Sequence, residues 1–188
     1  AAAAAAAGSS SQSPFGAKRI KTKEYIQRLE DNDETLTVLD LSDRTTFSNQ
    51  NAIDVARALH DNTACVEVHL RRCNIITSGA EAFGEMLKHN HTLKVLDLED
   101  NRIKTAGIEA IAVGLANNTC LEELVLFKNE EPGTAACAAF IKSLETNITL
   151  LRINWRISSR QSFAINKCIT RNNELLRRRK KEEAAAAA

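Results

Sequence analysis

The sequence predicts an α/β solenoid, in which repeated strand–helix units stack side by side. The first observation is an apolar frame, L-x-x-L-x-L, that recurs every 28 or 29 residues, with anchors at Leu36, Cys65, Leu93, Leu121 and Leu150. The second is an apolar stripe with helical periodicity between successive copies of that frame. The third is the stretch from Leu93 to Asn101, L-K-V-L-D-L-E-D-N, which matches the strand-and-turn segment of a leucine-rich repeat.

The chain before the first repeat is predicted to contain a linker and a capping helix. Residues 1–7 and 184–188 are uniform alanine and look like placeholders, so they are left out of the fold prediction. Residues 8–16 are rich in Ser, Gly and Pro, as a flexible linker is. Residues 18–29 have the apolar spacing of an amphipathic helix that caps the first repeat. We therefore expect a linker and placeholder at 1–17, a leucine-rich-repeat domain at 18–176, and a charged tail and placeholder at 177–188.

About five repeats follow, each beginning with a strand that contributes to a curved parallel sheet. The second apolar position of the frame is Leu39, Val68, Leu96, Leu124 and Ile153, and the third is Leu41, Leu70, Leu98, Leu126 and Trp155. The turn position reads Arg44, Cys73, Asn101 and Asn129. Asparagine there can bond backbone groups that are otherwise buried unpaired. Trp155, in the last repeat, is predicted to close the end of the core.

A helix on the outer side completes each repeat. Its last stripe leucine is Leu59, Leu87, Leu115 or Leu144, and an asparagine follows three residues later, at Asn62, Asn90, Asn118 and Asn147. Such an asparagine suits a left-handed residue that ends a helix. Thr77, Thr105 and Thr134 are the predicted N-caps. The final helix, over residues 161–169, has two polar stripe positions, as a terminal repeat requires.

Composition excludes several classes of function. The net charge is +1, with 25 basic and 24 acidic side chains, so nucleic-acid binding is not expected. No apolar run approaches the roughly 18 residues of a membrane span, so no membrane partner is expected either. Five cysteines without C-x-x-C pairing fit a reducing, cytoplasmic location. Catalytic, phosphate-loop and metal-binding motifs are missing, which predicts a non-enzymatic protein without cofactor or metal.

Two surfaces are candidates for contact with a protein partner. On the inner face of the sheet, Val95, Val125 and Phe127 are expected to be exposed among charges, which suits a protein partner; an ordinary solvated sheet face is the alternative. The loops from strand to helix form the second surface. The basic run 177–181 either contacts an acidic or phosphate-bearing surface or is a solvated chain end. The predicted contact residues are Arg71, Arg72, Glu99, Asp100, Arg102, Phe127, Lys128, Arg152, Arg156, Arg177 and Arg178.

Several stretches resemble the C-terminal leucine-rich-repeat domain of the tropomodulin and leiomodin family. They include residues 26–33 (I-Q-R-L-E-D-N-D), 82–101, 107–119 and, most specifically, 169–180 (I-T-R-N-N-E-L-L-R-R-R-K). The resemblance implies a cytoskeletal protein that binds actin at the pointed filament end and blocks subunit addition. In the family, a long upstream half carries tropomyosin-binding helices and another actin-binding helix. That half is expected to be lacking here, so no tropomyosin site is visible.

The sequence therefore supports two candidate functions. The first is a tropomodulin-like, cytoskeleton-associated module that binds actin through its loops and inner face. The second is a structural or scaffold subunit of a large ciliary, axonemal, cytoskeletal or organellar complex with no actin binding. An enzyme is the third and weakest reading, because no catalytic arrangement is apparent in the sequence.

Overall fold

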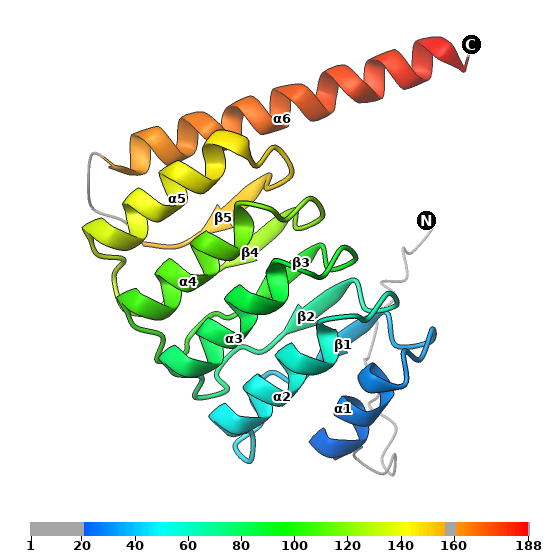
Figure 1. Ribbon diagram of the computed structural model, residues 1–188, viewed down its shortest axis with the longest axis vertical. Coiled ribbons are helices and arrows are strands. Elements are labelled where there is room, and N and C mark those ends of the chain that lie inside the picture. The colour runs from blue at the N-terminus through cyan, green and yellow to red at the C-terminus, as the bar shows by residue number, and fades with distance from the viewer. Residues whose placement is uncertain (1–20, 157–160, 188) are drawn as a thin grey trace, which may run out of the picture.

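The computed structural model describes residues 21–156 and 161–187, in which helices and strands alternate (Figure 1). The helices are α1 (Thr22–Glu30), α2 (Asn49–Leu59), α3 (Thr77–Leu87), α4 (Thr105–Leu115), α5 (Thr134–Thr146) and α6 (Gln161–Ala186). The strands are β1 (Val38–Asp40), β2 (Glu67–His69), β3 (Val95–Asp97), β4 (Glu123–Val125) and β5 (Arg152–Asn154). The linker predicted at 8–16 lies outside the described residues.

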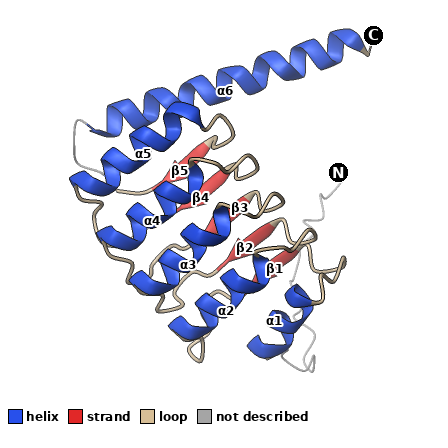
Figure 2. Cartoon of the chain, viewed as in Figure 1, coloured by secondary structure: helices blue, strands red, loops and turns tan. Residues whose placement is uncertain are grey.

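The strands form one parallel sheet in the order β1-β2-β3-β4-β5. The second apolar position of every repeat is in register with the next, as in the pairs Leu39↔Val68 and Leu96↔Leu124. Helices cover one side of the sheet and leave the other side open (Figure 2). Parallel neighbours need a crossover between them, and each helix supplies it. The predicted leucine-rich-repeat solenoid is confirmed.

The core lies between the sheet and the helices. Leu39, Val68, Leu96 and Leu124 are fully buried, as the strand frame predicts. At the far end, the Trp155 ring meets the Phe140 ring edge-on, with centroids 4.6 Å apart. Ile165 of α6 is also fully buried. The last repeat is therefore closed by an aromatic pair and by α6.

The asparagines after the helices do not act as predicted. Positive φ angles at non-glycine residues occur, within the described chain, only at Asn32, Asp43, Arg72, Asn74, Asp100 and Lys128. The four repeat asparagines are instead buried, and their amides bond the backbone. Asn118 shows the pattern: its Nδ2 donates to Leu87 O (2.8 Å) and Asn90 O (3.1 Å), and its Oδ1 accepts from Cys120 N (3.1 Å) and Leu121 N (2.8 Å).

This arrangement forms an asparagine ladder across the repeats, because each Nδ2 reaches a carbonyl of the preceding repeat. Its rungs are Asn62, Asn90, Asn118 and Asn147. Asn172 of α6 ends the ladder, donating to Asn147 O at 3.2 Å and to Leu150 O at 2.9 Å. The helix-ending turns are buried between repeats, so their carbonyls need donors from within the protein.

The predicted N-caps are wrong by one residue. Thr77, Thr105 and Thr134 are the first residues of their helices, and the residues before them hold the N-cap position. The side chains at those N-cap positions accept no capping bond. The N–H of Ile76, before α3, bonds to Asn49 Oδ1 of α2 at 3.0 Å. Here a neighbouring repeat supplies the acceptor.

Helix α1 caps the first repeat, as predicted. Its Ile26 and Leu29 are buried, and Leu29 O accepts the first rung of the ladder from Asn62 Nδ2 at 2.9 Å. The loop after α1 is tied to the next repeat by Asn32, whose Oδ1 accepts from Thr63 N at 2.8 Å. The cap therefore belongs to the same hydrogen-bonded stack as the repeats.

The Asp33 carboxylate in that loop gives a pH-dependent prediction. It accepts hydrogen bonds from Thr35 Oγ1 (2.6 Å), Thr35 N (2.9 Å) and Arg28 Nε (2.6 Å). These bonds, the Thr35 hydroxyl first, lower the pKa of Asp33 from 3.8 to about 2. A lowered folded-state pKa means that the contribution to stability is present above pH 3.8 and is lost as pH falls towards 2. We expect carboxyl NMR titration to find Asp33 near 2 and Thr35→Ala to raise that value. A wild-type Asp33 that titrates near 3.8 would contradict this geometry.

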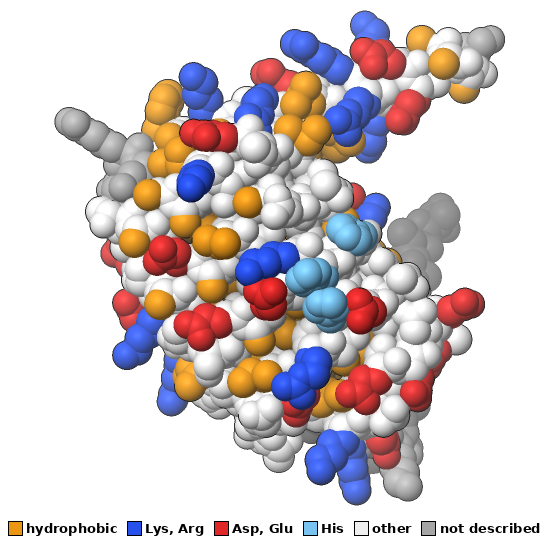
Figure 3. Space-filling view, viewed as in Figure 1, with side chains coloured by type: hydrophobic (Ala, Val, Ile, Leu, Met, Phe, Trp, Pro, Cys, Tyr) orange, Lys and Arg blue, Asp and Glu red, His pale blue; other side chains and the backbone are white. Residues whose placement is uncertain are grey.

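Helix α6 continues well beyond the last repeat. It has 26 residues and passes the expected domain boundary at 176 without a break, so residues 177–183 form a helical extension. No helix in the described segments has the length and apolar character needed to cross a membrane. Basic and acidic side chains are interspersed over the face seen in Figure 3, in keeping with the near-zero net charge.

Candidate protein-binding surface

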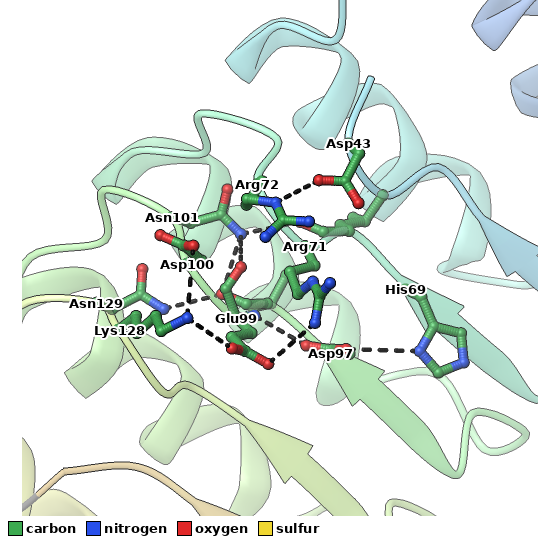
Figure 4. Close-up of polar contacts among 12 residues, drawn as sticks. Asp43, His69, Arg71, Arg72, Asp97, Glu99, Asp100, Asn101, Lys128 and Asn129 are labelled. Carbon is green, nitrogen blue, oxygen red and sulfur yellow. Dashed lines mark hydrogen bonds and ion pairs between the residues drawn. The ribbon is translucent and has the colours of Figure 1, made fainter. Parts of the chain in front are cut away.

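The loops that follow the strands meet along one edge of the sheet, because parallel strands end on the same side. Six of the eleven predicted contact residues lie there, on three consecutive loops, and Figure 4 shows five of them: Arg71, Arg72, Glu99, Asp100 and Lys128. Asp43, on the loop after β1, joins them through an ion pair with Arg72. We call these residues the loop cluster: Asp43, Arg71, Arg72, Glu99, Asp100, Phe127 and Lys128.

The backbone of the cluster repeats one turn. The residue three positions after each of the first four strands has a left-handed φ of 53–61°, at Asp43, Arg72, Asp100 and Lys128. These turns are bonded to one another, through Asp43 N to Arg71 O (2.9 Å), Arg72 N to Glu99 O (3.1 Å) and Asp100 N to Phe127 O (2.9 Å). A left-handed non-glycine residue costs about 1–2 kcal/mol. Glycine would relieve this strain, yet all four positions carry a charged residue. This favours a role for these side chains in binding.

Glu99 is the electrostatic centre of the cluster. Its carboxylate lies 3.5 Å from Lys128 Nζ and 3.9 Å from Arg71 Nη1, and its side chain is only 19% exposed. Lys128 Nζ is also 3.9 Å from Asp100 Oδ2. The surface therefore presents a network of paired charges rather than isolated ones.

Arg72 and Asp43 form the neighbouring part of the network. The hydrogen bond from the Arg72 guanidinium lowers the pKa of Asp43, and the same bond raises the pKa of Arg72. The whole cluster has three acidic and three basic side chains and thus no net charge. Recognition through it depends on shape and on matched pairing more than on long-range attraction.

Phe127 supplies the apolar part of the surface. Its ring is half-buried, and the Lys128 ammonium lies 5.8 Å from its centroid, within cation–π range. An aromatic side chain inside a charged rim is a common arrangement at the centre of protein interfaces.

The inner face of the sheet is less apolar than predicted. Val125 is buried, with 9% exposure, although it lies outside the main core cluster. Its neighbours in register are Asp97 and Asn154, and Phe127 follows two residues later on the same face. With strands about 4.8 Å apart, such neighbours cover a short valine. Val95 and Phe127 are half-buried, so the predicted exposure of all three apolar side chains is wrong.

Among the described residues, the other five predicted contact residues form no ion pair with the loop cluster. Arg102 is exposed on the loop after β3, where its backbone N–H donates to Ile75 O at 2.8 Å. Arg152 is at the opposite end of a strand, in β5, and pairs with Glu123 at 2.6 Å. Arg156 is exposed just after β5, and Arg177 and Arg178 are exposed on α6. The structure does not bring these five together.

Sequence reasoning missed two members of the charged surface. Asp43 occupies the same repeat position as Arg72, so the repeat register could have found it. His69, on the inner face beside the cluster, lies between two carboxylates, with Nε2 3.3 Å from Glu67 Oε2 and Nδ1 3.7 Å from Asp97 Oδ2. The contact with Glu67 lies within β2, and the pairing of β2 with β3 creates the contact with Asp97.

The chemistry of these side chains suits recognition. Within the part of the chain that the structure describes, no three His, Cys, Asp or Glu side chains are grouped as metal ligands. Burial raises the pKa of the Cys65 and Cys73 thiols to about 11, which makes them poor nucleophiles. Paired surface charges around an aromatic ring can bind a complementary surface.

Comparison with known proteins gives consistent matches. The family model described as "TMOD/LMOD Leucine-rich domain" matches residues 18–175. Human leiomodin-2 is 30% identical over 153 residues, which is 80% of this chain and 28% of that protein. Mouse tropomodulin-4 is 27% identical over 155 residues, which is 81% of this chain and 45% of that protein. The chain thus spans less than half the length of these relatives.

Two solved structures share the fold. A structure described as "Leiomodin-1 Actin-Binding Site 2 (ABS2)" superposes with a TM-score of 0.81 at 24% identity and covers 91% of this chain and 100% of its own. The tropomodulin C-terminal domain of Caenorhabditis elegans superposes with a TM-score of 0.75 at 17% identity and covers 87% and 99%. At these identities the likeness shows the fold alone.

Proposed function

The chain belongs to the tropomodulin and leiomodin family of leucine-rich-repeat domains, and from that premise we propose that it binds actin. The observation that carries the proposal is the family match over residues 18–175, which spans every repeat and the capping helix. We further propose that the protein acts at the pointed end of the filament.

We propose the loop cluster, with the adjoining inner face, as the contact surface. Four loops present charged side chains held by a shared, hydrogen-bonded turn, so the surface is preorganised. A rigid surface loses little conformational entropy on binding, which favours affinity. We place the protein at the cytoskeleton. Tropomyosin binding and a ciliary location form no part of the proposal.

An elongation assay tests the function. Filaments with capped barbed ends are extended with pyrene-labelled actin, so that growth reports only the pointed end. We expect micromolar protein to slow elongation and to cosediment with filaments. Unchanged elongation together with no cosedimentation would exclude actin binding, and native purification in an actin-free complex would then support the scaffold function.

A double substitution tests the surface. Arg71→Ala with Lys128→Gly removes both cations that contact Glu99, and glycine accepts the φ of 58° at position 128 without strain. Loss of central charged anchors typically costs about 2 kcal/mol, so we expect affinity for actin to fall about 30-fold. Cosedimentation at several actin concentrations measures it.

The control is Arg57→Ala on α2, because its side chain is 74% exposed on the helical side of the molecule. We expect its affinity to stay within about 2-fold of the wild type. Equal losses from the control and the double variant would move the contact surface away from the loop cluster. Thermal unfolding of all three proteins checks that each remains folded.

A further inference from the structure

A groove lies on the edge of the sheet opposite the loop cluster. Helix α6 extends past the repeats on that side (Figure 1). The loops from helix to strand of three consecutive repeats form its floor, and α6 forms its wall. Its volume is about 280 Å³. We call it the α6 groove, and hydrophobic side chains gather where α6 leaves the body of the protein (Figure 3).

The wall of the groove is fixed in place. Asn172 and Asn173 of α6 donate to backbone carbonyls of the last helix-to-strand loop, at 2.9 Å to Leu150 O and 2.9 Å to Leu151 O. Arg171 Nη2 donates to Leu144 O at 2.6 Å, at the end of α5. The helix is therefore anchored immediately before it overhangs the loops, and the groove exists before any ligand binds.

The inner part of the groove is apolar. Leu175 and Leu176 of α6 are half-buried in its wall, and Leu151 is half-buried in its floor. Ile148 beside them is 36% exposed. Apolar side chains left partly open in a hollow indicate a place for a large apolar side chain. Small-molecule sites usually enclose about 300–1,000 Å³, so this hollow fits one or two side chains of a peptide better than a whole ligand.

The rim of the groove is basic. Arg179 lines it, and it lies within the run Arg177–Lys181, whose side chains are exposed. Across the described residues, none of these five cations has an ion-pair partner, whereas Lys94 on the floor is paired with Glu122 at 3.1 Å. Unpaired cations beside an apolar hollow complement carboxylates that flank an apolar side chain.

We propose that the α6 groove binds a linear acidic segment of a protein partner, with a large apolar side chain inserted between α6 and the loop floor and a flanking carboxylate on Arg179, the α6 cation that lines the groove. The described residues that line the groove include His91 but no Phe, Tyr or Trp for stacking on bases, which disfavours a nucleic acid. The hollow lies behind an overhanging helix, which disfavours a flat membrane surface. The groove is separate from the loop cluster, so this proposal can fail or hold whether or not the loop cluster binds actin.

Peptide selection on the whole chain tests the proposal. A phage-displayed library of random peptides is panned on the wild type and counter-selected on Arg179→Glu. We expect the enriched peptides to carry a large apolar residue flanked by Asp or Glu. A fluorescein-labelled consensus peptide is then titrated by anisotropy. We expect Arg179→Glu and Ile148→Asn each to weaken binding at least 10-fold.

The matched control is Lys180→Glu, which makes the same change of net charge one residue away, outside the groove lining. We expect it to weaken binding less than 3-fold. Failure to enrich acidic peptides, equal losses from Arg179→Glu and Lys180→Glu, or a consensus peptide displaced by single-stranded RNA or by phosphatidylserine vesicles would each overturn the proposal. Circular dichroism confirms that the three variants keep the helical content of the wild type.

Discussion

Asn118→Ala is expected to lower the free energy of unfolding by about 4 kcal/mol, because it leaves several buried backbone groups without partners. The Asn118 amide bonds two carbonyls and two N–H groups, and its side chain is 2% exposed. Each buried group left unpaired costs about 1–3 kcal/mol, and partial access of water to the turn reduces the sum. Urea denaturation followed by circular dichroism measures the change.

The adjacent Asn117 provides the control, since it has the same side chain but is exposed. Asn117→Ala should change the free energy of unfolding by less than about 0.5 kcal/mol. Similar small losses at both positions would show that the ladder does not hold the repeats together. A large loss of unfolding free energy for Asn118→Ala alone would establish the asparagine ladder as the main polar link between neighbouring repeats.

Gly114→Ala is expected to destabilise the protein by about 3 kcal/mol or more, because α3 and α4 are in backbone contact at this point. A Cβ at position 114 would lie 2.2 Å from Gly84 O and 3.0 Å from Gly84 C. A backbone atom cannot turn aside as a flexible side chain can, so the two helices must separate. That separation opens the core at the centre of the solenoid. Thermal and urea unfolding measure the loss.

Gly133→Ala is the control for this substitution. A Cβ there would meet only the side chain of Thr105, at 3.1 Å, which can shift. We expect a change within about 1 kcal/mol. Because alanine is the better helix former by about 1 kcal/mol, a stable Gly114→Ala protein would mean that α3 and α4 are not in close contact.

The features that could be predicted from the sequence were those with a period. The second apolar position of the strand frame, as at Leu39 and Leu96, is fully buried in each of the first four strands, because the pattern of burial has the same period as the repeat. The helical stripe located the helices between Thr77 and Leu87 and between Thr105 and Leu115 to within a residue. A periodic core leaves a periodic apolar pattern, so the fold class followed from it.

The features that were missed depend on contacts between repeats. The role of Asn90 could not be read locally, because its partner is a carbonyl of the preceding helix. The burial of Val125 comes from neighbours on adjacent strands, and the pairing of Arg72 with Asp43 crosses from one loop to the next. Residue spacing within one repeat cannot predict contacts between neighbouring repeats. These contacts also depend on the register in which the strands pair.

The sequence predicted which loops form the candidate site, but it did not predict the ion pairs between their side chains. Arg71, Glu99 and Lys128 each come shortly after a strand, so they were expected to lie along one edge of the sheet. The structure places them there. The turn with left-handed φ could not be foreseen at Arg72 or Asp100, because neither residue type requires it. The ion pairs that hold these side chains follow from that turn.

Hydrogen–deuterium exchange of the protein with and without actin tests whether the loop cluster is the face that we propose contacts actin. We predict that actin protects the amides of residues 98–104 and 126–133, while α2 on the helical side exchanges as in the free protein. Protection confined to the outer helices, with the loops unchanged, would contradict the claim.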